Sequence, residues 1–237
     1  FRNPLYREGF LNALMVAACT TVLCFFLALP LAWIADRYTF PGRRWLSAGL
    51  LLPMILPPFV GALGMQKILG QYGALNSLLV RVGLADPASL PDWLAAGGIA
   101  GVVVVEALHL YPIFYLNLAA ALANVDPLLE EAAANLGCAG FQRFRRVTLP
   151  LIAPGVFAGG TLVFIWSFTE LGTPLMFDFE RITPVQIYNG VNEIGDNPFP
   201  YALVVVLLAV SATLYLSARG VLGRHAYCGT VRQNNAS

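Results

Sequence analysis

Residues 10–35 read FLNALMVAACTTVLCFFLALPLAWIA and contain no Asp, Glu, Lys or Arg. A helix needs about 20 apolar residues to cross the roughly 30 Å hydrocarbon core of a bilayer, where lipid offers no partner for a backbone N–H or C=O group. The run is also longer than the apolar region of a cleaved signal peptide. This stretch therefore predicts a transmembrane α-helix.

The rest of the chain has the same character. Of its 237 residues, 58% are hydrophobic and 11% are charged, whereas charged residues make up about 25% of an ordinary soluble domain. Four more apolar stretches are long enough to cross a membrane, at about residues 46–65, 94–123, 147–177 and 199–218. We expect an all-α polytopic membrane protein of about five transmembrane helices. Its transmembrane core is expected to occupy residues 1–227, with a polar tail or linker at residues 228–237.

The second stretch carries three prolines, Pro53, Pro57 and Pro58. Each proline removes a backbone donor from a helix and clashes with the preceding turn. We therefore expect this span to be kinked and to line a cavity.

The distribution of charge is more informative than its sum. The formal net charge is +1, so nothing indicates a nucleic-acid partner. Cytoplasmic loops of membrane proteins collect Lys and Arg. If the loop after the third span is cytoplasmic, that side holds most of the basic residues, including Arg43, Arg44 and the cluster at residues 143–146. This choice places the N-terminus of the chain outside and its C-terminus inside.

The loop after the third span begins with DPLLEEAAANLG at residues 126–137. Asp126 is a favourable N-cap, Pro127 suits the first helical position, and the acidic pair that follows lies near the positive end of the helix dipole. Gly137 permits the left-handed conformation that ends a helix. The loop therefore predicts a short helix, with a second turn or two at residues 141–147. An Ala-rich hairpin whose arginines contact anionic lipid, with no protein partner, is an alternative.

The order of residues in this loop resembles the EAA loop of ABC-importer permeases, E-A-A-x3-G-x9-I-x-L-P. The matching residues are Glu131, Ala132, Ala133, Gly137, Val147, Leu149 and Pro150, with Val147 in place of the usual Ile. The stretch from Glu170 through Gly172 to Pro174 is similar to the D/E-F-G-x-P of the ferric-iron, thiamine, polyamine and phosphonate branch, although Leu171 replaces Phe.

The resemblance implies the five-helix permease core of a binding-protein-dependent importer in a bacterial cytoplasmic membrane. The helix after Asp126 would be a coupling helix that docks on a cytoplasmic ATPase dimer, which alone binds ATP and Mg. The coupling residues would be the seven of the motif together with Glu130. The remaining partners would be an extracytoplasmic solute-binding protein and a second permease core, either a second copy or the other half of a fused chain. Ferric iron is the solute that the resemblance suggests first.

Glu106 lies in the middle of the third span, where a carboxylate costs about 2.5–3.5 kcal/mol on insertion scales. His109 is three residues later on the same helical face. These two residues could pair with each other, hold helices together or line the translocation pathway. Glu170, Gly172 and Pro174 are expected at a gate near the outer end of the fourth span. We expect no metal site, because two ligands complete no coordination set.

Two other functional classes stay open at this point. One is a proton-coupled secondary transporter that uses Glu106 and Glu170 as proton carriers. The other is an intramembrane enzyme with Glu106 and His109 as acid and base, although the sequence shows no catalytic motif and no P-loop, and Lys67 is its only lysine. We therefore expect a transport permease that is not itself an enzyme and binds no cofactor.

Overall fold

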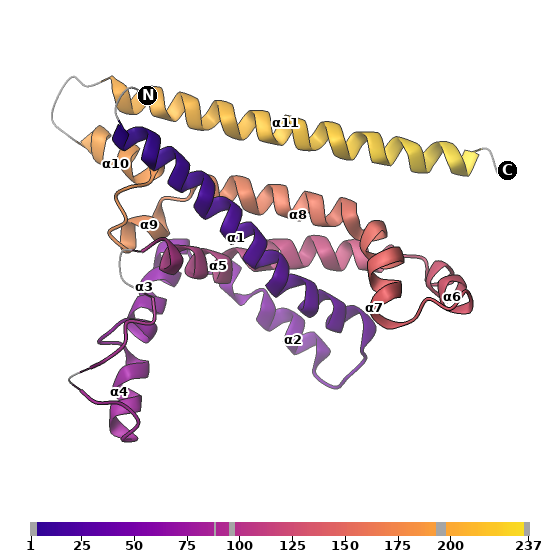
Figure 1. The fold of residues 1–237 in the computed structure, drawn as a ribbon, viewed down its shortest axis with the longest axis horizontal. Helices are drawn as coiled ribbons and strands as arrows, with labels where there is room; N and C mark the ends of the chain where they lie inside the picture. Colours follow the sequence, from indigo (N-terminus) through magenta and orange to yellow (C-terminus); the bar gives the residue numbers. More distant parts are fainter. Residues whose placement is uncertain (1–3, 88, 95–97, 193–197, 235–237) are drawn as a thin grey trace.

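The structure is a computed structural model that describes residues 4–87, 89–94, 98–192 and 198–234, with side chains as far as residue 220. Throughout this part of the chain the regular structure is helical, which confirms the expected all-α class. Three long helices pack together at the centre: α1 (Pro4–Arg37), α5 (Ile99–Ala123) and α8 (Leu149–Thr169). The fourth long helix, α11 (Phe199–Asn234), runs beside α8 along one side of the bundle (Figure 1).

The central helices approach closely because small residues face the contacts. The fully buried positions of α1 recur every three to four residues along one face and are almost all small: Ala13, Val16, Ala17, Thr20, Cys24, Ala28 and Ala32. Gly155 in α8 lies so close to α5 that an added Cβ atom would be 2.4 Å from the Cβ of Ala121. Lipid tails are as apolar as these side chains, so close van der Waals packing must hold the helices together.

The expected second span is broken rather than merely kinked. It consists of α2 (Arg43–Leu50), a 3-10 turn η1 (Leu52–Met54) and α3 (Pro58–Leu69), followed by α4 (Ala74–Arg81). The segments on either side of the break meet at 102°. The break falls at the prolines, which cannot donate to the preceding turn.

The other expected spans keep their places but not their limits. The third helix begins at Ile99 instead of residue 94, after Gly98 in extended conformation, and residues 95–97 lie outside the described residues. The fourth stops at Thr169 instead of residue 177, because Glu170 adopts an extended conformation and α9 (Gly172–Met176) starts anew. In the described chain, four helices are long and apolar enough to cross a membrane, or five if the bent pair counts as one.

The first and last helices extend beyond the expected limits. Helix α1 begins at Pro4 and ends at Arg37, whereas the apolar run covers residues 10–35. Helix α11 continues to Asn234, so most of the expected tail at residues 228–237 is helical. A helix can extend past its apolar run because its backbone hydrogen bonds are internal, so polar residues can continue it on either side of the hydrocarbon core.

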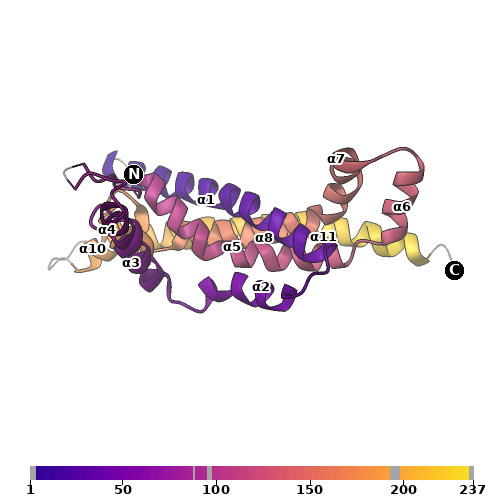
Figure 2. The same ribbon diagram turned by 90° about the horizontal axis from the view of Figure 1, so that it is seen from below.

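The bundle has two different ends (Figures 1 and 2). One end bears α6 (Pro127–Asn135) and α7 (Gly140–Arg143), and the C-terminal half of α11 extends toward it. The other end bears the N-terminus, α9, α10 (Thr183–Asn192) and an arm made of α3 and α4 that projects away from the bundle. The arm is held at its tip by buried Asn76, whose Nδ2 donates to the carbonyl oxygens of Gln71 and Pro91, both at 2.8 Å.

Helix α6 begins and ends as the sequence predicts. The side chain of Asp126 accepts a hydrogen bond of 2.9 Å from the backbone N–H of Leu128. Gly137 has φ of +84°, and the N–H of Cys138 donates to the carbonyl of Ala133 at 2.9 Å, which closes the last turn. The chain then continues through α7 and a π-helical turn, η2 (Phe144–Thr148), directly into α8.

Gly155→Ala tests the close contact between α5 and α8. The added methyl group would overlap Ala121, so we expect the free energy of unfolding in detergent to fall by about 1–3 kcal/mol. Gly160→Ala is the matched control, because its methyl group would lie 3.6 Å or more from Phe114 and Thr21. Equal stabilities of the two variants would contradict this packing.

Gly137→Val tests the backbone conformation of the turn after α6, where, unlike at Gly155, no neighbouring atom is close. No atom lies within 4 Å of an added Cβ, so the whole cost comes from the left-handed backbone. We expect a loss of about 1–2 kcal/mol in the free energy of unfolding. Gly137→Asn should lose less, because Asn tolerates this conformation. A valine variant as stable as the asparagine variant would show that Gly137 does not adopt it.

Candidate functional site

The two adjacent glutamates of α6 point to different surroundings. Glu131 is exposed, and so is Ala132, while Ala133 is buried against the rest of the loop. Glu130 is only 4% exposed. Glu131 is therefore exposed on α6, which lies at the end of the bundle beyond the ends of α1, α5 and α8 (Figure 1).

Glu130 is held by two donors from other elements. Its Oε1 accepts a hydrogen bond from Arg37 at the end of α1 and another, of 2.7 Å, from the hydroxyl group of Thr148. Burial by itself would raise the pKa of Glu130, but these hydrogen bonds and the positive charges of Arg37 and Arg143 outweigh it, and the net pKa is lowered. Glu130 is therefore an ionised group turned toward the interior, tied to α1 and to the turn before α8, whereas Glu131 beside it is exposed. The coupling role of Glu130 stays a prediction.

The last residues of the expected coupling motif lie where the loop rejoins the bundle. Val147 belongs to the π-helical turn and Leu149 begins α8, and both are partly buried. Pro150 is exposed in the first turn of α8. These three residues shape the return of the chain, whereas the exposed part of the motif is in α6.

Glu106 lies inside the bundle, 1% exposed. Its Oε2 accepts hydrogen bonds from Thr20 of α1, at 3.4 Å, and from Ser167 of α8. Its Oε1 has no hydrogen-bond partner. Glu106 thus joins the three central helices by side-chain hydrogen bonds. Such hydrogen bonds are stronger in the interior, where no water competes for the same groups.

His109 faces a different region from Glu106. It lines a cavity of about 740 Å³ formed by α3, η1 and α5, beside the carbonyl of Pro53. No hydrogen bond or ion pair joins His109 to Glu106 in the described part of the chain, although three residues separate them. The structure therefore does not assemble the acid–base pair that an intramembrane enzyme would need.

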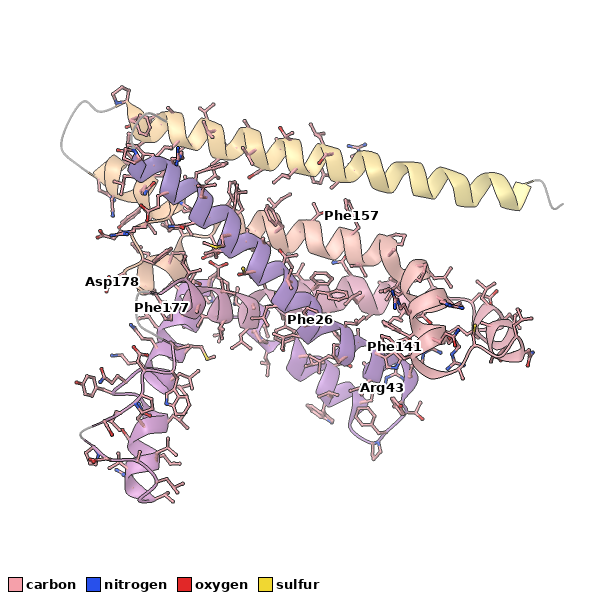
Figure 3. The ribbon with its side chains drawn as sticks, viewed as in Figure 1. Phe26, Arg43, Phe141, Phe157, Phe177 and Asp178 are labelled. Atoms are coloured by element: carbon pink, nitrogen blue, oxygen red, sulfur yellow. The ribbon has the colours of Figure 1, made fainter. Side chains whose placement is uncertain are left out.

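The cavity beside His109 lies at the broken span, as the prolines predict. Its wall is apolar, and among the described residues that line it there is no Asp, Glu, Lys or Arg. The lining includes Leu52, Pro53, Ile55, Leu56, Val60, Gly61, Met65, Leu108 and Tyr111. A second cavity, of about 620 Å³, lies between α1, α8 and α11 and includes Phe157 of α8, labelled in Figure 3.

Glu170 closes the C-terminal end of α8. Its Oε1 accepts a hydrogen bond of 2.9 Å from the N–H of Gly172, at the start of α9. Gly172 is packed closely, since an added Cβ would lie 3.3 Å from Phe59, and Pro174 is buried. The three residues expected at a gate thus form one turn in contact with α3, the arm helix next to the cavity.

Several of the residues that hydrogen-bond to these glutamates could not be recognised from the sequence. Thr20 and Ser167 are single hydroxyl residues in apolar helices, where such residues commonly bond to their own backbone. Arg37 looks like an ordinary basic residue at the end of a span. A carboxyl group in the membrane does indicate that some partner exists, but it does not indicate on which helix.

The comparisons with known proteins agree with this geometry. A probable molybdenum ABC transporter permease protein of Haloferax volcanii is 34% identical over 92% of this chain and 77% of its own length. The sulfate transport system permease protein CysT of Salmonella typhimurium is 29% identical over 94% of this chain and 78% of its own. The spermidine/putrescine permease protein PotB of Haemophilus influenzae is 34% identical, over 69% of this chain and 56% of its own.

A solved structure supports the fold. A bacterial ABC transporter involved in the import of alginate matches with a TM-score of 0.70 at 17% identity, over 94% of this chain and 80% of that one. The family model of the binding-protein-dependent transport system inner membrane component matches residues 12–226. This chain therefore belongs to that family, the inner-membrane permeases of ABC transporters, and is a transport permease rather than an enzyme.

Proposed function

We propose that the chain is the permease subunit of an ABC importer in which α6 is the coupling helix and Glu131 its main polar contact with a cytoplasmic ATPase. The observation that carries the proposal is the exposure of Glu131 on a capped helix that lies beyond the ends of α1, α5 and α8. Ala132 adds a small exposed side chain beside it, which allows a partner surface to approach closely. Gly137 ends this helix and directs the chain back to the bundle.

The remaining assembly follows from this assignment. The end with α6 is cytoplasmic, and the end with α9, α10 and the arm faces a solute-binding protein. ATP and Mg belong to the ATPase dimer. The cavity beside His109 is half of a translocation pathway that a second permease core completes, because it is an open apolar surface at a broken span.

We propose a tetrahedral oxyanion, such as molybdate or sulfate, as the solute in place of ferric iron. The names of the Haloferax and Salmonella relatives indicate oxyanions, and none of the three relatives described above is named for iron. The chemistry of the cavity agrees. Ferric iron and polyamines are cations that carboxylates stabilise, whereas the described lining has no carboxylate to repel a dianion.

The proton-coupled alternative has less support. Glu106 is enclosed by hydroxyl donors from two neighbouring helices, and Glu170 caps α9. Neither carboxyl group lines the cavity beside His109.

Glu131→Arg tests the contact with the ATPase. Reversing the charge at the exposed face of α6 should reduce co-purification of the ATPase in mild detergent by about tenfold, the equivalent of about 1.4 kcal/mol. Glu180→Arg is the matched control, because Glu180 is an exposed carboxylate at the opposite end. Undiminished ATPase recovery with Glu131→Arg, scored by mass spectrometry, would contradict the assignment of α6.

Leu56→Glu tests the charge preference of the pathway. Leu56 lines the cavity and is partly accessible, so a carboxylate there would repel a passing dianion. We expect uptake of labelled molybdate or sulfate to fall at least tenfold below that of Leu56→Gln, which has the same shape without the charge. Cells that take up ferric iron or spermidine through the wild-type permease, but neither oxyanion, would refute the proposed solute.

A further inference from the structure

We propose that Arg37, Glu130 and Thr148 form a latch that carries the movement of the coupling helix α6 to the spanning helices α1 and α8. The inference rests on the proposed function, because it assumes that an ATPase moves α6. The three residues are positioning residues: they act through α6 and do not contact the ATPase.

The latch joins three elements at one carboxyl oxygen. Oε1 of Glu130, in α6, accepts hydrogen bonds from Arg37, the last residue of α1, and from Thr148, the last residue of the π-helical turn that leads into α8. Thr148 is fully buried, and the Glu130 side chain is 5% exposed. The Arg37 side chain is 31% exposed, so the shelter from water is at the Glu130 and Thr148 side of the latch. Charge-assisted hydrogen bonds to a buried oxygen are stronger than neutral ones.

Aromatic contacts fix the position of the arginine. The Arg37 guanidinium lies 4.8 Å from the ring centre of Trp33, one turn earlier in α1. Trp33 in turn meets Phe144 of the π-helical turn edge to face, with ring centres 5.1 Å apart. Arg37 is therefore held from behind and has little freedom to follow Glu130 if α6 moves alone.

Helix α6 has few other attachments to the bundle. Its main contacts are with α7 and η2, which belong to the same loop. Of the ion pairs formed by described residues, only the one between Arg37 and Glu130 connects α6 to a spanning helix. Without the latch, a push on α6 would be taken up within the loop. With it, α1 and the start of α8 must move as α6 moves.

The latch gives the two glutamates of α6 different roles. Glu131 on the outer face makes the contact with the ATPase, and Glu130 on the inner face transmits it. Loss of Glu131 should therefore weaken assembly. Loss of Glu130 should leave assembly intact and separate ATP hydrolysis from transport.

The test uses the whole transporter, with its ATPase and binding protein, and measures ATPase co-purification, ATP hydrolysis and solute uptake on the same preparations. We expect Glu130→Gln and Arg37→Met to keep wild-type ATPase recovery and continued hydrolysis, while uptake per ATP hydrolysed falls at least tenfold. Thr148→Val, which keeps the shape and removes the hydroxyl donor, should show a smaller loss in the same direction. Arg44→Met, which removes an exposed arginine of α2, is the matched control and should behave as wild type.

The exchanged pair Arg37→Glu with Glu130→Arg gives the second measurement. A restored charge pair should recover at least part of the uptake per ATP that the single changes lose, an outcome that a purely structural role of either side chain does not produce. If Arg37→Met or Glu130→Gln fails to assemble, the exchanged pair and Thr148→Val still decide the question.

Three results would overturn the latch. The first is wild-type uptake per ATP in Glu130→Gln. The second is loss of ATPase recovery in Glu130→Gln to the extent seen with Glu131→Arg, which would make Glu130 a docking residue. The third is an exchanged pair that assembles and transports no better than the single variants. Absence of any ATPase from the wild-type preparation would instead overturn the proposed function, and the latch with it.

Discussion

Every backbone N–H and C=O group that lies in hydrocarbon must find its partner within the protein, and the architecture depends on this constraint. It explains why the four long segments are helices and why small residues of α1 bring the helices into contact. It also explains where irregular backbone is tolerated. The break at Pro53, Pro57 and Pro58 lines a cavity, and the interruption at Glu170 is closed by the carboxylate itself. Glu106 follows the same rule in part, since its Oε2 accepts hydrogen bonds from hydroxyl groups of two neighbouring helices while its Oε1 has no partner.

The glutamates that the sequence marked as candidate functional residues fall into two groups, those bonded within the protein and one that is exposed. Glu106, Glu130 and Glu170 each accept hydrogen bonds from the chain itself, within the bundle, at its α6 end and at its α9 end. Glu131 is exposed. Both kinds suit a permease whose helices move against one another. The internal carboxylates hold neighbouring segments together, and the exposed carboxylate is free to contact a partner protein. The cavity wall, in turn, is left apolar, which suits a pathway through which a solute must pass without being retained.

The sequence was sufficient for the class, the family, the number of apolar spans and the start and end of α6, because all of these depend on local composition, caps and a motif of fixed spacing. It was insufficient wherever the partner comes from a distant part of the chain. Glu130 and Glu131 are neighbours in the chain, and the donors that hold Glu130 inside come from Arg37, 93 residues earlier, and from Thr148, 18 residues later. Glu106 and His109 share a helical face by spacing, yet α1 and α8 enclose the first and the broken span faces the second. The proposal of an oxyanion comes from the names of the relatives and from the cavity lining, and the sequence motif of Glu170 to Pro174 had suggested ferric iron instead.

The length of α1 has a consequence for the membrane around the protein. Arg7 and Arg37 lie thirty positions apart in one helix, which at about 1.5 Å per residue is about 45 Å. That length is comparable to the whole thickness of a bilayer, about 40–45 Å with its headgroup regions included. If α1 crosses the bilayer along its normal, Arg37 would reach the headgroup region, where lipid phosphates and Glu130 would compete for the same guanidinium group. The charge of the surrounding lipids would then affect the α1–α6 junction.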